Sequence, residues 1–304
     1  MNKDAALIKD LAETEQRNPA SLNFDQLTPL EMVRLMNQED AKVPLAVAEV
    51  LPQIAQTVEW VTSTLESGNR LFTMGAGTSG RLAVLDAAEL LPTFRLEPGR
   101  VIALLAGGLD ALTRSIEGKE DEADQGRVDL MQHDFSSEDM LIAVAASGRT
   151  PYALGGLAYA KELGATTVAL VCTTHSVMAR RADLAIEVVP GPEVLTGSTR
   201  LKAGTAQKLV LNMISTCAMA KLGKVFGNLM IDVQPSNIKL RKRAKRIVCQ
   251  ATGESEDMAQ KLLEAANWDV KAAVVMALMD VDAQTACQKL RTSTGRVREA
   301  LKSA

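Results

Sequence analysis

The pattern of apolar and polar positions divides the chain into three parts. Between residues 58 and 222, short apolar runs alternate with longer segments of mixed polarity. Four of the five runs are continuous, which is typical of strands covered on both faces. The pattern predicts helical stretches such as 109–131 and 151–163, and strands at 71–74, 101–105, 141–145, 167–171 and 184–189. This alternation predicts an α/β domain with a five-stranded, mainly parallel sheet.

Helical patterns flank this central part. The amino-terminal part is punctuated by Pro19 and Pro29, and Thr28 is a typical N-cap followed by proline in the first helical position. After residue 222 the pattern predicts a small bundle of three or four short helices. We therefore expect an N-terminal helical segment at 1–57, a sheet domain at 58–222 and a C-terminal helical domain at 223–304.

Composition and charge narrow the range of partners. A chain of 304 residues with 47% hydrophobic content can bury a full core. The net charge is -3, and residues 1–57 hold five Lys or Arg against nine Asp or Glu, a net of -4, which argues against a nucleic-acid-binding arm. Charges interrupt the amino terminus before any signal-like apolar region, and no later run is long enough to span a bilayer. We expect a cytoplasmic protein with no nucleic-acid or membrane partner.

Cysteine and histidine are too sparse for most metal and redox chemistry. The four cysteines are isolated, without a Cys-x-x-Cys pair, and indicate buried apolar residues in a reducing compartment. With His133 and His175 as the only histidines, a zinc site or a histidine triad lacks material. We expect no metal and no cofactor.

Two glycine-and-hydroxyl loops follow the first and third predicted strands. Each loop, 75–81 and 145–150, opens a predicted helix. Glycines let the backbone approach an anion, hydroxyls donate to it, and a helix amino terminus adds unpaired N–H groups. If the strand order is 2-1-3-4-5, both loops flank the switch point where open α/β sheets bind ligands. The predicted phosphate contacts are Gly77, Thr78, Ser79, Ser147, Gly148, Arg149 and Thr150.

The first loop also fits a dinucleotide-binding turn. Gly75, Gly77 and Gly80 have the spacing Gly-x-Gly-x-x-Gly. Such a site would need an acidic residue at the end of the second strand, whereas here Asp110 lies beyond Gly107-Gly108. A nicotinamide-cofactor site and a tight turn without ligand therefore stay as alternatives.

A third cluster of hydroxyls and cations covers residues 191–202. It precedes a predicted long helix that runs to about Lys221. Ser198 and Lys202 could add donors to the same anion, and ordinary N-capping by Ser198 or Thr199 is the simpler alternative.

A basic run lies at residues 239–246, with six cations in eight positions. Such runs usually form a solvated helix face. Lys239 and Arg243, however, share one face at i,i+4 spacing and could close over a phosphate.

Three glutamates are candidates for acid and base chemistry. Glu89 follows the first loop on an apolar helical stretch, and Glu117 and Glu120 follow the second strand. Burial would raise the pKa of such a carboxyl toward neutral pH. From the residues alone, a solvated or ion-paired surface group is the more common role for each of them.

The two loops with five parallel strands resemble the sugar isomerase (SIS) domain, a flavodoxin-like three-layer fold whose Ser- and Thr-rich loops hold sugar phosphates. More specifically, the chain resembles the N-acetylmuramic acid 6-phosphate etherase family, which is related to glucokinase regulatory protein. The resemblance covers nearly the whole chain, including a small UBA-like tail. The stretches that carry it are 75–85, 145–152, 193–212 and 223–230, of which 193–208 is the most specific.

The resemblance implies a lyase of cell-wall sugar recycling that removes D-lactate from N-acetylmuramate 6-phosphate without metal or nucleotide. It places the family's two catalytic glutamates on Glu89 and Glu120. Glu120 would be the base and Glu89 the acid, or the reverse. A homodimer, in which a second subunit completes the site, is implied by resemblance as well.

Rival functions share parts of this pattern. A non-catalytic sugar-phosphate regulator like glucokinase regulatory protein shares the 193–208 pattern, but that protein has two such domains in tandem and this chain has room for one. A phosphosugar isomerase is nearer, while an aminotransferase would need an amino-terminal cysteine that this chain lacks. A transcriptional regulator would need the basic arm that the N-terminal charge excludes.

Overall fold

The computed structural model describes residues 13–233, 235 and 237–302, so the first twelve residues of the predicted N-terminal segment lie outside the described residues. The chain divides into two compact units. The first combines the residues up to 87 with residues 99–215, and the second combines residues 88–98 with the residues from 216 onward.

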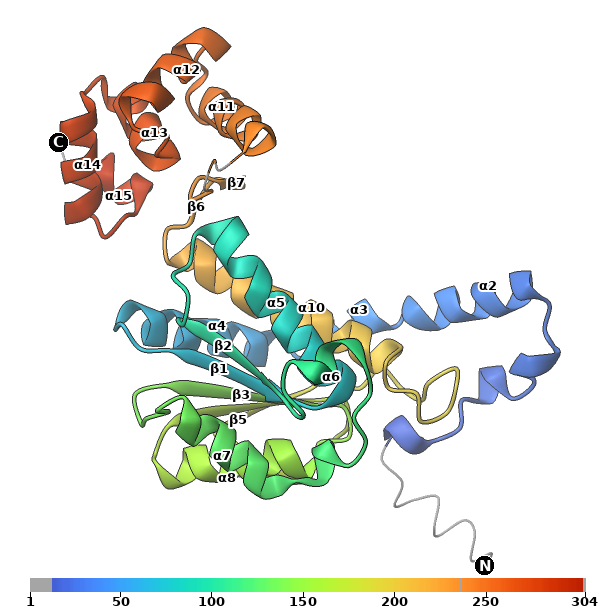
Figure 1. Cartoon of the computed structure of the whole chain (residues 1–304). Helices are drawn as coiled ribbons and strands as arrows, with labels where there is room; N and C mark the ends of the chain where they lie inside the picture. Colours follow the sequence, from blue (N-terminus) through green and yellow to red (C-terminus); the bar gives the residue numbers. More distant parts are fainter. Residues whose placement is uncertain (1–12, 234, 236, 303–304) are drawn as a thin grey trace, which may run out of the picture. The chain divides into compact units, whose positions relative to one another are not determined.

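A five-stranded, fully parallel sheet forms the centre of the first unit (Figure 1). Its order is β2-β1-β3-β4-β5, the order that was assumed in placing both loops at the switch point. The strands are β1 (Leu71–Gly75), β2 (Val101–Leu105), β3 (Met140–Ala145), β4 (Thr166–Val171) and β5 (Leu184–Glu187). Every residue of β1 and β3 is buried, because helices cover both faces of these central strands.

Helices flank this sheet in two layers. In Figure 1, α7 and α8 lie on one face, and α4 lies on the other. The first unit also contains α9 and the amino-terminal parts of α5 and α10. Asp86 of α5 accepts hydrogen bonds from Asn212 (2.6 Å) and Ser215 (3.0 Å) of α10 and thereby joins these two helices. The bounds are α4 (Leu51–Glu66), α5 (Gly77–Phe94), α7 (Ala123–Gln132), α8 (Pro151–Glu162), α9 (Val177–Arg181) and α10 (Lys202–Lys221).

The predicted continuous helical stretch at 109–131 is wrong. The structure has a short helix α6 (Asp110–Thr113), a 3-10 turn η4 (Lys119–Asp121) and then α7. Gly118 has a left-handed φ of 79°, which a helix interior does not tolerate. The break leaves residues 114–122 as a connection beside residues 75–81; these residues and residues 145–150 are here called the first and second phosphate loops.

The amino-terminal part contains more turn than helix at its start. Three 3-10 turns, η1 (Glu13–Glu15), η2 (Pro19–Ser21) and η3 (Phe24–Gln26), precede α2 (Pro29–Asp40) and α3 (Val43–Ala48). The predicted cap at Thr28 is confirmed, because Thr28 accepts from the Glu31 N–H and the Glu31 carboxylate accepts from the Thr28 N–H. The boundary predicted at residue 57 falls inside α4.

The second unit contains a two-stranded hairpin and a helical bundle. The hairpin was not predicted, because each of its strands has only two residues, and more helices form than the three or four that were expected. Asn237, Ser255, Asp269 and Asp282 each cap a helix. The bounds are β6 (Val225–Phe226), β7 (Leu229–Met230), α11 (Ile238–Thr252), α12 (Glu256–Ala265), α13 (Val270–Met279), α14 (Ala283–Thr292) and α15 (Val297–Ala300).

The two tryptophans lie in different units. Trp60 is on α4 in the first unit. Trp268 in the second unit lies beneath Arg241, whose guanidinium carbon is 4.7 Å from the ring centroid.

The cysteines were expected to be buried, but only Cys172 is fully buried, and Cys217 is exposed; all four are free thiols. Among the described helices, none has the length and apolar character needed to cross a membrane.

Candidate active site

A cavity of about 390 Å³ opens where β1 and β3 end. Both predicted phosphate loops line it, together with part of the third cluster. The structure therefore brings these loops together at the switch point of the sheet. The predicted contacts that line this cavity are Gly77, Thr78, Ser79, Ser147, Arg149 and Thr150. The third cluster contributes Gly197 and Thr199, the two neighbours of the predicted contact Ser198.

Two glycines allow the loops to pack this closely. A Cβ on Gly80 would lie 2.5 Å from the Gly75 carbonyl oxygen, so the first turn of α5 can approach β1 only at a glycine. Gly148 has a φ of 61°, and a Cβ there would collide with the Ser176 side chain. Gly148 therefore shapes the second loop, although it does not line the cavity itself.

The cavity is rich in hydrogen-bond donors. It lies at the amino terminus of α5, which begins at Gly77, and beside the start of α8 at Pro151. The first-turn N–H groups of a helix have no partner within the helix and carry the positive end of its dipole. Together with the loop hydroxyls and the Arg149 guanidinium, they favour an anionic group such as a phosphate.

A second cavity of about 210 Å³ shares part of its wall with the first. Ala76, Gly77 and Glu120 line both cavities, and Glu117 lines only the second. The Glu120 carboxylate thus belongs to an exposed turn that stands between the two spaces.

Arg81 holds the segment that carries these glutamates. Its guanidinium donates to the carbonyl oxygens of Ala111 (2.8 Å) and Arg114 (3.1 Å). Because Arg81 is on the first turns of α5, it ties the connection after α6 to the first phosphate loop. This contact makes the position of Glu120 depend on Arg81, which was not among the predicted site residues.

The structure gives Lys202 a different partner from the one predicted. Its side chain is 1% exposed, and its ammonium donates to Glu39 Oε2 at 2.7 Å instead of reaching the cavity. Capping of α10 also differs from the prediction of Ser198 or Thr199. Glu193 accepts from the backbone N–H groups of Lys202 (3.0 Å) and Ala203 (2.9 Å), so a carboxylate nine residues upstream caps the helix.

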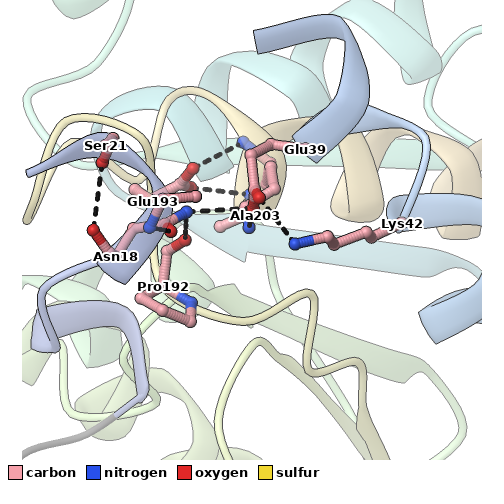
Figure 2. Close-up of polar contacts among 9 residues, drawn as sticks. Asn18, Ser21, Glu39, Lys42, Pro192, Glu193 and Ala203 are labelled. Atoms are coloured by element: carbon pink, nitrogen blue, oxygen red, sulfur yellow. Dashed lines mark hydrogen bonds and ion pairs between the residues drawn. The ribbon is translucent and has the colours of Figure 1, made fainter. Parts of the chain in front are cut away.

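Figure 2 shows the buried network around Glu39. The Glu39 carboxylate accepts from Asn18 (2.9 Å) and Lys42 (2.6 Å) as well as from Lys202. Burial alone would raise the pKa of Glu39, but the hydrogen bonds from Lys202, Lys42 and Asn18 outweigh burial and lower it to about 2. Burial raises the pKa of Glu193, despite its two N–H donors. This network fixes both ends of the 193–202 loop whose middle lines the cavity.

Three predicted site residues belong to the second unit. Glu89 is exposed on α5, past the point where that helix passes into the second unit. Lys239 and Arg243 line one hollow of about 820 Å³ with other cations of α11. Their shared face is confirmed by this hollow, whereas a role of these three residues toward a ligand stays a prediction.

Sequence reasoning missed Glu15. This residue of η1 lines the cavity of the phosphate loops, as do the acids Glu120 and Asp121 of η4 and the cation Arg149. Nothing in the local sequence distinguishes Glu15 from the neighbouring acids, because its position follows from the contacts that Glu13 makes with Thr173 and Thr174, about 160 positions away.

Comparison with family models places known domains on this fold. Residues 53–161 match the model described as the glucokinase regulatory protein N-terminal SIS domain, and residues 121–216 match the SIS domain. Residues 248–284 match a UBA-like domain. The α/β fold predicted from the sequence is thus that of a SIS domain.

Curated relatives match almost the full length of the chain. It is 53% identical over 288 residues to the N-acetylmuramic acid 6-phosphate etherase of Pectobacterium atrosepticum, covering 95% of both chains. It is 52% identical over 288 residues to the protein of the same name from Actinobacillus pleuropneumoniae, again covering 95% of both. Among solved structures, a phosphoheptose isomerase from Francisella tularensis matches with a TM-score of 0.50 at 19% identity, covering 64% of this chain and 100% of that one, which supports the fold.

Proposed function

We propose how this site works from the premise that the chain belongs to the N-acetylmuramic acid 6-phosphate etherase family. The chain is a carbon–oxygen lyase that cleaves the lactyl ether of N-acetylmuramate 6-phosphate in cell-wall sugar recycling. Its products are N-acetylglucosamine 6-phosphate and D-lactate. The observation that carries our proposal for the residues is that Glu120 and both phosphate loops line one cavity.

The reaction needs one base and one acid. In the open-chain aldehyde the carbonyl at C1 acidifies the C2 proton, and the lactyl ether at C3 is β to that carbonyl. A base removes the C2 proton, the electron pair forms the C2–C3 double bond as the C3–O bond breaks, and the lactyl oxygen leaves protonated as D-lactate. Water then adds its oxygen to C3, and C2 regains a proton. Two positioned carboxyl groups suffice for these transfers.

In our proposal the phosphate loops hold the 6-phosphate. Thr78, Ser79, Ser147 and Thr150 donate hydroxyl hydrogen bonds, and the amino terminus of α5 adds backbone N–H groups. The exposure of Ser147 and Thr150 toward the same cavity as Gly77 supports this arrangement. Gly148 shapes the second loop, and Arg149 supplies a positive charge. Ser198 lies between Gly197 and Thr199, which line the cavity.

We assign Glu120 as the base at C2 and Glu89 as the acid that protonates the leaving lactate and activates water; the reverse assignment is the alternative. The wall position of Glu120 between two cavities supports its contact with a sugar whose phosphate is held by the loops. Glu117 faces the second cavity and is assigned to substrate binding. Lys239 and Arg243, which share one face of α11 at i,i+4 spacing, are assigned to the substrate phosphate. Lys202 instead positions the 193–202 loop through Glu39.

The test is direct. Purified full-length protein, incubated with N-acetylmuramate 6-phosphate, is expected to release D-lactate and N-acetylglucosamine 6-phosphate in equal amounts, measured with D-lactate dehydrogenase and by mass spectrometry. Protein that binds the sugar phosphate and releases no lactate would favour a regulator. Conversion of substrate to an isomer of the same mass would favour an isomerase.

We also propose a homodimer. Leu30, Val33, Leu45 and Leu51 on α2, α3 and the start of α4 are between 47% and 68% exposed, and large apolar side chains that gather on a surface are typical of a protein contact. A second copy is the partner that we infer for this surface. Sedimentation velocity is expected to give a dimer for the wild type and a monomer for Val33→Asp combined with Leu45→Asp; a monomeric wild type would contradict the proposal.

The four free thiols support our further proposal that the enzyme acts in the cytoplasm.

A further inference from the structure

Residues 13–18, here called the N-terminal strap, are attached to the first unit at both ends. At one end the Glu13 carboxylate accepts hydrogen bonds from the hydroxyls of Thr173 and Thr174, which follow β4. At the other end Asn18 donates to Glu39 (2.9 Å) and to the Pro192 carbonyl oxygen (3.0 Å), as Figure 2 shows. Asn18 also caps η2 by accepting from the Ala20 N–H. The strap is therefore held in place by contacts on both sides of its turn.

Glu15 is the strap residue that reaches the cavity. It lines the space together with Thr78, Ser147 and Glu120. Its Oε2 would lie 3.6 Å from a Cβ built on Gly197, so the carboxylate stands beside the third cluster. Within the described part of the chain, no hydrogen bond or ion pair of the Glu15 carboxylate is found, whereas Glu13 two residues away has two partners.

The chemistry of this position points to a neutral donor on the ligand. An ionised carboxylate only accepts hydrogen bonds, and it repels other anions. The loop hydroxyls, the helix N–H groups and Arg149 supply donors that match a phosphate, while Glu120 and Asp121 add two further carboxylates on the side of η4. A carboxylate held at the rim of such a site matches the hydroxyl groups of the sugar and disfavours the phosphate and the lactyl carboxylate at the same place.

We propose that Glu15 is a specificity-determining residue that accepts hydrogen bonds from sugar hydroxyl groups and thereby sets which end of the ligand enters the phosphate loops. This inference rests on the sugar-phosphate site proposed above. It assigns Glu15 no proton transfer, so its removal acts on binding more than on the chemical step. The anchors at Glu13 and Asn18 make Glu15 act from a fixed position, which lowers the entropy lost when the sugar binds.

The test compares two probes by calorimetric titration. N-acetylglucosamine 6-phosphate carries both hydroxyls and phosphate, and inorganic phosphate carries only the anion. Glu15→Ala is expected to weaken the binding of the sugar phosphate by roughly 10- to 100-fold, which corresponds to the loss of one hydrogen bond to a charged group. Inorganic phosphate is expected to bind to this variant at least as tightly as it binds to the wild type. Glu15→Gln, which keeps an acceptor oxygen, is expected to lose less than Glu15→Ala.

Controls separate this role from others. Glu138→Gln changes an exposed acid before the amino end of β3, at the opposite edge of the sheet, and is expected to alter neither titration. If Glu15→Ala strengthens the binding of both probes by the same factor, Glu15 only repels anions and the proposal is wrong. With substrate, KM should rise while kcat stays within a few-fold; a fall in kcat alone contradicts the proposal.

The outcomes also distinguish this inference from the proposed function. Wild-type protein that releases no lactate, but shows the expected pattern with the two probes, would remove the enzyme assignment and leave the role of Glu15 intact. Wild-type protein that releases lactate, with an unchanged KM in Glu15→Ala, would remove the role of Glu15 alone.

Discussion

Glu120→Ala is expected to reduce D-lactate release by roughly 100- to 10,000-fold, the contribution of a positioned general acid or base. The reason is that Glu120 stands in the wall shared by both cavities, next to the loops that we propose hold the phosphate. Because Glu120 is exposed in a 3-10 turn, the substitution should leave the melting temperature nearly unchanged. Initial rates with the lactate assay give the measurement.

The control and the assignment of roles come from the same set of variants. Asp124→Asn changes an exposed acid on the first turn of α7 that lines neither cavity, and it should keep the wild-type rate. In heavy water, a variant that lacks only the acid can still exchange the C2 proton without releasing lactate, whereas one that lacks the base can do neither. Exchange by Glu89→Gln but not by Glu120→Gln, followed by proton NMR, supports our assignment. Exchange by Glu120→Gln alone reverses the roles, and wild-type release by Glu120→Ala contradicts a catalytic role for Glu120.

Glu39→Ala is expected to destabilise the first unit by about 3–5 kcal/mol, the usual cost of leaving a buried charge without its partner. The Lys202 ammonium is 1% exposed and would lose the carboxylate at 2.7 Å. Chemical denaturation gives the free energy of unfolding. Lys42→Ala removes the other cation of the same carboxylate, but the Lys42 side chain is 58% exposed, so it should cost less than about 1 kcal/mol.

A double variant and a pH series extend this test. Glu39→Leu combined with Lys202→Met removes both charges and should recover much of the loss, since no unpaired ion is left. The pKa of Glu39 is lowered to about 2, below the value of about 4.3 for an unfolded glutamate. Its contribution is therefore complete above that unfolded value and is lost as the pH falls toward 2. The raised pKa of Glu193 has the opposite effect on stability, so the contribution of Glu39 is obtained as the difference in the free energy of unfolding between wild type and Glu39→Gln. If this free energy changes equally with pH in both proteins from pH 6 to pH 3, the proposed network is contradicted.

The sheet and the two phosphate loops could be predicted because their signals are local. Strands such as β3 are continuous apolar runs, and the glycines and hydroxyls of each loop follow them directly in sequence. The break after α6 was missed because residues 109–131 have enough helical periodicity, and the pattern does not register the left-handed backbone at Gly118. Local sequence patterns thus predict the two phosphate loops but not the connection that carries Glu120.

The rest of the site depends on contacts between distant residues. Lys202 was expected to meet the ligand because a cation after hydroxyls suggests an anion site, but its partner Glu39 lies 163 positions earlier. The same limit applies to Glu13, which contacts Thr173 across 160 positions. Periodicity and motif spacing carry no information about such pairs, so Glu15 could not be singled out from the sequence.

The division of the two tryptophans between the compact units makes the chain its own fluorescent reporter. Trp268→Phe would leave the emission of Trp60 in the first unit, and Trp60→Phe would leave that of Trp268 in the second. Chains with two units need not unfold in one step, so a single melting curve would mix two events. With these two variants, each event can be followed at its own indole, and any instability of Glu39→Ala can be traced to the unit in which it begins.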